Sequence, residues 1–503
     1  MNRPDFLIFI ADEMQSFSLG CNGNPDVKTP NIDRLAREGC TFRRAYCNNP
    51  VCMPSRATLL TGLTPRQHGC VTNGMILQES VPTLTKALTD QGYRTHSIGK
   101  IHLQPVGSVA KDGRDRPFSW EDRDRWDRGE IKSLPPSYYG FQTTELVNGH
   151  VHYCFGDYRS WLDKHYPGMH AQYGGDKAYA KGLGPSSWRM EIPPSIHYNH
   201  WIGDRSIAFL EDLKQDENYF LWCSFPDPHV PFAACRPYSE MYDPNEISIS
   251  QTWDQQEDDL PHLARHRNAF FRKRMSESEV REVTAQTYGM ITHIDDNIGR
   301  ITKHLESIGR LDNTILVFMA DHGEYLGCHG LLYKNVWMYE EMIRVPFVWR
   351  VPDAYGKGGG SDLVTSLLDF VPTILEYAGI PLEALDNRGE GAAERKILPG
   401  RSLKSFLSRG ILPEDRPALL EYDEDWLPGP FYRVRSIVGS RYKLTVYPIP
   451  GEGVLTDLEQ DPLEKNNLWS DPEYAGIKAQ LMEQLLIDLV KTDRLDQRRI
   501  TGA

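Results

Sequence analysis

The sequence has no hydrophobic stretch long enough to cross a membrane, and basic residues are outnumbered by acidic ones. The first apolar run, residues 5–11, is too short and wrongly flanked for a signal peptide, so we expect a buried strand there. Lys and Arg total 56 against 69 Asp and Glu, a formal net charge of -13. Binding to nucleic acid needs clustered Lys and Arg. We therefore expect neither a membrane nor a nucleic acid as a partner. We also expect a cytoplasmic protein, or a periplasmic or secreted one if a leader has been removed.

Cysteine residues are few and irregularly placed, and repeats are absent. The nine cysteines, an odd number between Cys21 and Cys328, form neither a spaced metal pattern nor a compact disulfide framework. No low-complexity run or repeat of solenoid period occurs, and 40% hydrophobic with 25% charged residues is typical of globular proteins. A length of 503 residues exceeds one ordinary core. We predict a catalytic domain over residues 1–385 and a smaller C-terminal subdomain over 386–503.

Four apolar runs are each followed directly by polar residues capable of chemistry. They are residues 6–11 before Asp12 and Glu13, 94–98 before Lys100 and His102, 220–225 before Asp227 and His229, and 314–320 before Asp321 and His322. Continuous apolar runs that alternate with helical segments are typical of parallel strands buried on both faces. Ligands of such sheets gather outside the carboxyl ends of the strands. The four polar groups are therefore predicted to meet at one edge.

The segments between these runs favour an α/β fold with a large, mostly parallel sheet sandwiched by helices. The clearest helix begins after Ser276, where Glu279 completes a capping box, and ends near Gly309. Asp295 and Asp296 on this helix are expected to face solvent. Residues 103–200 show no sustained period, and we interpret them as loops and short elements that cover the site.

The C-terminal region carries a different pattern. Four segments have the composition of short strands: residues 418–422, 432–438, 441–447 and 454–458. The apolar spacing in residues 471–492 predicts an amphipathic helix at the end of the chain. We predict a small antiparallel sheet with one helix.

One short motif is specific enough to indicate a function. Cys52, Pro54, Ser55 and Arg56 stand at fixed spacing before Gly62, at the start of a predicted helix. A lone cysteine is usually a small buried hydrophobe, but the complete motif makes that interpretation weaker. The motif resembles the maturation signal of the type I sulfatases, a formylglycine-dependent family of the alkaline-phosphatase-like superfamily. The resemblance implies that a formylglycine-generating maturation enzyme oxidises Cys52 to Cα-formylglycine, whose hydrate carries two hydroxyls on one carbon.

The resemblance also implies a divalent metal site. The matching positions are Asp12, Glu13, Cys52 as its modified form, Asp321 and His322. Carboxylate oxygens suit Ca²⁺, which we expect as the cofactor. Many relatives have Asp at the position of Glu13 and Asn at that of His322, and an imidazole ligand makes Mn²⁺ the alternative.

The remaining catalytic residues come from the same resemblance. Cys52 would supply the nucleophile, and Arg56 would fix it. Lys100 and Lys334 would clamp the sulfate. Three residues would move protons. His102 would accept the proton whose loss triggers the elimination of sulfate, and His229 would protonate the departing alcohol. Asp321 would assist deprotonation of the attacking hydroxyl.

These residues predict a sulfuric ester hydrolase that acts on the sulfate monoester of a small molecule or a saccharide. The alternative is a phosphonate monoester or phosphodiester hydrolase with the same formylglycine and metal site. A metal-stabilised binding protein would result if Cys52 were never converted. The natural ester, exo or endo action and a homo-oligomeric state stay open.

Overall fold

The computed structural model describes residues 3–107, 117–182, 184–255, 260–270, 275–352, 360–385, 398–425 and 431–493. Its strands are β1 (Asp5–Ala11), β2 (Cys40–Tyr46), β3 (Arg94–Gly99), β4 (Thr143–Asn148), β5 (Phe155–Gly156), β6 (Ala180–Lys181), β7 (Trp188–Arg189), β8 (Tyr219–Phe225), β9 (Thr314–Ala320), β10 (Phe347–Arg350), β11 (Gly360–Ser366), β12 (Ala418–Asp425), β13 (Phe431–Val438), β14 (Tyr442–Val446) and β15 (Gly453–Asp457).

The α-helices alternate with the strands along most of the chain. They are α1 (Pro30–Glu38), α2 (Cys52–Thr61), α3 (Pro65–His68), α4 (Leu84–Asp90), α5 (Arg123–Asp127), α6 (Asp157–His165), α7 (Tyr198–Glu211), α8 (Pro261–Phe270), α9 (Glu277–Ser307), α10 (Glu340–Ile343), α11 (Phe370–Ala378), α12 (Lys404–Arg409) and α13 (Ala475–Lys491).

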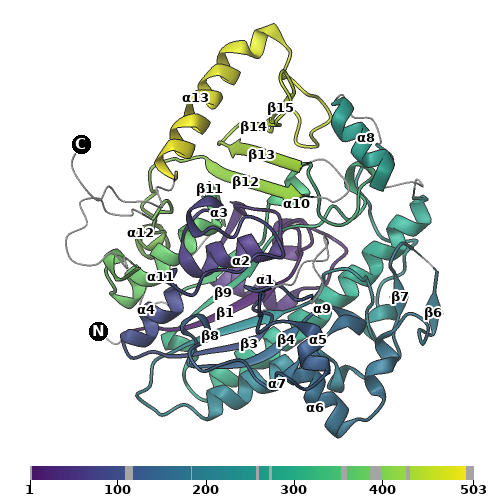
Figure 1. Ribbon diagram of the computed structural model, residues 1–503, viewed down its shortest axis with the longest axis vertical. Coiled ribbons are helices and arrows are strands. Elements are labelled where there is room, and N and C mark those ends of the chain that lie inside the picture. The colour runs from purple at the N-terminus through teal and green to yellow at the C-terminus, as the bar shows by residue number, and fades with distance from the viewer. Residues whose placement is uncertain are drawn as a thin grey trace.

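A nine-stranded sheet forms the centre of the molecule, with the order β11-β2-β10-β9-β1-β8-β3-β4-β5 (Figure 1). Strands β9, β1, β8, β3 and β4 are consecutive and parallel. Every residue of β1, β8 and β9 is buried, as expected for apolar strands covered on both faces. The predicted mostly parallel sheet is confirmed, and the four predicted strand ends lie within one residue of the observed ones.

Two groups of helices sandwich this sheet. Helices α1 and α7 both pack against α9, while α2 and α4 both pack against α11. Helix α9 begins at the predicted capping box, in which the Ser276 hydroxyl accepts from the backbone of Glu279. The prediction that Asp295 faces solvent is wrong. Asp295 is buried because its carboxylate accepts the backbone N–H groups of Asn31 and Ile32 at the start of α1.

The C-terminal strands form the predicted antiparallel sheet, in the order β12-β13-β14-β15, at the upper end of the molecule in Figure 1. Alternate residues of β12 face opposite ways. Leu420 joins the main core, while Leu419 packs with Leu485 of α13 in a separate small core. This strand therefore contributes side chains to two hydrophobic cores, one on each of its faces. The boundary between residues 385 and 386 stays a prediction, because residues 386–397 lie outside the described part.

Residues 103–200 contain loops and short elements, as predicted. Strand β4 joins the large sheet beside β3, and α6 packs on it. In the described residues, no helix is both long and apolar enough to cross a membrane. All nine cysteines lie in the described part and none forms a disulfide.

Candidate active site

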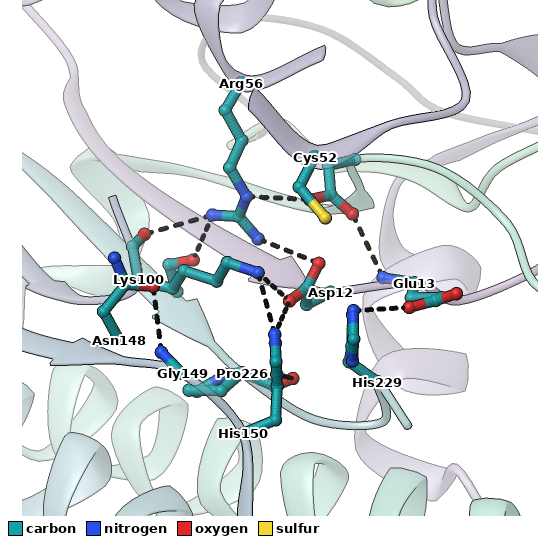
Figure 2. A network of polar contacts seen from close by, with 12 residues as sticks. Asp12, Glu13, Cys52, Arg56, Lys100, Asn148, Gly149, His150, Pro226 and His229 are labelled. Atoms are coloured by element: carbon teal, nitrogen blue, oxygen red, sulfur yellow. Dashed lines mark hydrogen bonds and ion pairs between the residues drawn. The ribbon is translucent and has the colours of Figure 1, made fainter. Parts of the chain in front are cut away.

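The carboxyl ends of β1, β3, β8 and β9 bring the predicted site residues to one edge of the sheet. These strands are parallel, so the residues that follow them leave the sheet on the same side. Asp12 and Glu13 follow β1, Lys100 follows β3, and His229 comes after β8. Figure 2 shows these side chains converging below Cys52.

Cys52 is the first residue of α2 and lies at the centre of this group. Its side chain is buried, and its sulfur lies 3.1 Å from Nε2 of His322. Burial raises the pKa of a thiol, but the positive charges of Lys100 and Lys334 outweigh burial and hold the pKa of Cys52 well below its usual value. The helix start adds further positive potential. The site thus stabilises negative charge on the group at position 52.

Arg56 lies one helical turn after Cys52 and is completely buried. Its guanidinium donates to Oδ2 of Asp321 at 2.7 Å, to Oγ of Ser224 at 2.9 Å and to the carbonyl oxygen of Lys100 at 3.1 Å. One side chain therefore connects α2 with the ends of β3, β8 and β9. A buried cation with such fixed partners orients its neighbours.

Four predicted metal-binding residues form one cluster. One ligand atom each from Asp12, Cys52, Asp321 and His322 lies within 4.8 Å of the others. Oδ1 of Asp12 is buried and has no hydrogen-bond partner, as expected of an atom that accepts a cation. Nδ1 of His322 lies 2.9 Å from the carbonyl oxygen of Gly323, which directs Nε2 toward the cluster. The residues present therefore fit a divalent cation.

Glu13, the fifth predicted ligand, has another set of partners. Its Oε2 lies 2.7 Å from both Nζ of Lys334 and Nε2 of His229, while Oε1 is buried without a hydrogen-bond partner. Glu13 adopts a positive φ of 60°, which is uncommon for a residue other than glycine. Metal binding by Glu13 stays a prediction.

The two predicted proton-carrying histidines differ in charge. Burial, assisted by the positive charge of Lys100, lowers the pKa of His102 to about 4. Burial also opposes the charged form of His229, but the carboxylate of Glu13 outweighs it and raises the pKa of His229 to about 9. Near neutral pH, His102 is free to accept a proton and His229 carries one to donate.

Lys100 and Lys334 reach the site from two loops. Nζ of Lys100 contacts Oδ2 of Asp12, and Nζ of Lys334 lies 2.7 Å from Nε2 of His229.

Burial raises the pKa of Asp321 to about 6, although the positive charge of Arg56 acts against the rise. The carboxylate of Asp321 can therefore take up a proton near neutral pH.

Two further residues belong to the site and were missed by sequence reasoning. His150 follows β4 and stacks on His229, with ring centroids 3.5 Å apart. Glu121 is buried and accepts the N–H groups of Leu103 and Gln104, directly after His102. The only signal for His150 was the Asn148-Gly149 turn pair before it.

Two features define the class of protein. The edge of the parallel sheet carries a cation site of carboxylates and an imidazole, and the Cys-x-Pro-Ser-Arg motif lies at the start of a helix beside it. Together they define a metal-dependent hydrolase of the alkaline-phosphatase-like class. The sulfatase family model matches residues 4–380, and the model for the C-terminal region of N-sulphoglucosamine sulphohydrolase matches residues 327–491. The chain belongs to the sulfatase family and is a sulfuric ester hydrolase.

Individual relatives are similar to this chain over nearly its whole length. An arylsulfatase of Clostridium perfringens is 27% identical over 94% of this chain and 91% of its own length. A multifunctional alkaline phosphatase superfamily protein, PehA of Trinickia caryophylli, is 29% identical over 95% of this chain and 93% of its own. The crystal structure of a phosphonate monoester hydrolase of Agrobacterium radiobacter has the same fold, with a TM-score of 0.79 at 24% identity. That comparison covers 97% of this chain and 96% of the other.

Proposed function

We propose that the protein hydrolyses sulfate monoesters with a formylglycine formed from Cys52 and one divalent cation. The observation that carries this proposal is the position of Cys52. Its sulfur lies in the same buried cluster as the ligand atoms of Asp12, Asp321 and His322, so one ion can contact them all. An unmodified cysteine carries a single thiol and no hydroxyl, so it lacks the second group that would release sulfate from the same carbon.

The hydrated formylglycine supplies two hydroxyls on one carbon: one forms a bond to sulfur as the alcohol leaves, and the other releases sulfate when the carbon returns to the aldehyde. Asp321 accepts the proton of the first hydroxyl. His229 donates its proton to the departing alcohol oxygen, which has taken the electron pair of the broken S–O bond. His102 then accepts the proton of the second hydroxyl, and sulfate leaves with the electron pair of its bond to carbon.

Asp12, Asp321 and His322 would hold the cation, with Glu13 as a proposed fifth ligand beside position 52. The bound ion would supply positive charge for the sulfate oxygens. We propose Ca²⁺, which the carboxylates favour, and keep Mn²⁺ as the alternative because of the imidazole of His322. Lys100 and Lys334 would neutralise the remaining oxygens of the sulfate.

The partners are a small-molecule or saccharide sulfate ester and a formylglycine-generating enzyme. The match to the C-terminal model of N-sulphoglucosamine sulphohydrolase supports a sulfated saccharide as the substrate class. Cys52 is 1% exposed, so a modifying enzyme would have to act before this region folds.

Parallel kinetics on one preparation test the proposed reaction. kcat/KM is measured for an aryl sulfate and for an aryl phosphonate monoester, the substrate of the alternative function. We expect the sulfate ester to be preferred. A decisive preference for the phosphonate would replace the proposed function with the alternative.

A further inference from the structure

The segment that ends β4 is built to place one side chain in the active site. Asn148 donates from Nδ2 to Oε2 of Glu121 at 2.7 Å, and its Oδ1 accepts the N–H of Gly149 at 3.0 Å. Gly149 has a φ of 75°, and a Cβ there would lie 2.2 Å from the carbonyl oxygen of Tyr153. Only glycine fits this turn. The next residue, His150, therefore projects into the site from a fixed backbone.

The contacts of the His150 ring define its tautomer. Nδ1 lies 3.2 Å from the carbonyl oxygen of Pro226, which can only accept, so Nδ1 carries the proton. Nε2 is then an acceptor, and it lies 3.3 Å from the ammonium of Lys100. Figure 2 shows this ammonium beside both Nε2 of His150 and the carboxylate of Asp12, whose Oδ2 lies 3.6 Å from the same Nε2. Among the residues that the structure describes, two acceptors lie beside its three N–H groups, which leaves one N–H group for an anion.

The face of the same ring supports a second site residue. The rings of His150 and His229 are parallel within 4°, with centroids 3.5 Å apart. His229 also contacts Glu13 and Lys334 through its Nε2. Stacking on the neutral ring of His150 thus fixes the orientation of the His229 ring, so that its Nε2 stays directed at Glu13 and Lys334.

We propose that His150 is a positioning residue with two separable roles: its Nε2 aims the Lys100 ammonium at the substrate's anionic group, and its ring face aligns His229 for proton donation to the leaving alcohol. This inference rests on the proposed function and deepens it. The site would bind a tetrahedral oxyanion through Lys100, and His229 would protonate alcohols that are poor leaving groups. Neither role requires His150 to touch the substrate.

Two substitutions separate the roles. His150→Phe keeps a ring against His229 but removes the acceptor for Lys100. We expect its affinity for inorganic sulfate to fall by about tenfold and its KM for sulfate esters to rise by about the same factor. His150→Gln keeps an acceptor near Lys100 but removes the ring. We expect its kcat to fall by about tenfold for an alkyl sulfate, whose leaving group needs a proton, and by less than about twofold for an activated aryl sulfate.

The control is His152→Gln, two residues further on, where the imidazole contacts Tyr153 and Trp188 and none of the site residues. It should match the wild type in every measurement. Circular dichroism verifies the fold of each variant. The proposal is overturned if both His150 variants stay within about twofold of the wild type, or if each loses activity equally on both substrates with unchanged affinity for sulfate. Sulfate binding by calorimetry needs no turnover, so it tests the Lys100 role even if the proposed sulfatase reaction fails.

Discussion

At the scale of single residues, the site is a buried arrangement of alternating charges. Asp12 and Asp321 are fully buried, and so are the cations Arg56 and Lys100 that contact them. Buried charges are tolerated only when they are paired and hydrogen-bonded. Asp12 and Asp321 each offer one oxygen to the same cluster, where a divalent cation would add positive charge to this arrangement.

Replacing Cys52 with Ala should abolish turnover and leave the fold intact. The side chain fills little volume, and the residues that hold α2 in place, Arg56 above all, are unchanged. We expect kcat to fall by at least about 10³-fold, as for loss of a nucleophile. The matched control is Cys223→Ala, a buried cysteine on β8 outside the site, which should keep its activity. Gross unfolding of the Cys52 variant in circular dichroism would contradict the expectation.

Residues with a short-range signal were predictable, and residues with long-range partners were not. Cys52 and Arg56 belong to one motif, and Asp321 follows an apolar run directly. His150 has no comparable signal, because its role depends on Lys100 and Pro226, 50 and 76 positions away in sequence. The error at Asp295 has the same origin: its buried carboxylate caps a helix 264 positions away.

At the scale of elements, burial explains which strands the sequence predicts well. β1, β8 and β9 are uniformly apolar because both faces are covered, so their ends are visible in the sequence. β4 lies near the edge of the sheet and has the mixed pattern Thr-Thr-Glu-Leu-Val-Asn, with an exposed first residue. A short, half-polar strand cannot be distinguished from a loop by its periodicity.

Glu121 links the segment after β3 to the end of β4, because it accepts hydrogen bonds from Leu103 and Asn148. It should make the stability of the fold depend on pH. Burial raises its pKa to about 7, although it accepts hydrogen bonds from Leu103, Gln104 and Tyr138. The folded state therefore holds a proton that the unfolded chain releases near pH 4.5. The stabilising contribution is complete below that pH and is lost as the pH rises through about 7, a change of about 3 kcal/mol.

The test compares the wild type with Glu121→Gln, which cannot titrate. The free energy of unfolding is measured in urea at several pH values between 4.5 and 8. We expect the wild type to lose stability relative to the variant over this range. A difference between the two proteins that does not vary with pH would contradict the assignment.

At the scale of the whole molecule, the C-terminal sheet is fixed to the segment that carries Cys52. Asn48 and Asn49 donate to the carbonyl oxygens of Leu419 and Glu421 on β12, at 2.8 and 2.7 Å. The loop before α2 is thereby held by the neighbouring C-terminal sheet. The composition of the C-terminal segments made this sheet predictable. Its connections to residues 48 and 49 were not predictable, because side-chain contacts between distant segments leave no periodic signal.

Cation binding should stabilise the whole fold, because its ligands come from β1, α2 and β9 together. At a free Ca²⁺ concentration 100 times the dissociation constant, the free energy of unfolding should rise by about 2.7 kcal/mol. A chelator should remove both this gain and the activity. Asp321→Asn should abolish the calcium response, and Asp296→Asn, on the outer part of α9, should retain it. An equal response in both variants would place the ion elsewhere, and stronger stabilisation by Mn²⁺ would favour the alternative metal.

The most direct test of the account is peptide mass spectrometry of residue 52 in a preparation with measured sulfatase activity. We expect the peptide that contains position 52 to carry an aldehyde, to react with a hydrazide, and to be converted in proportion to the specific activity. A fully active preparation in which Cys52 is an unmodified thiol would contradict the proposed chemistry.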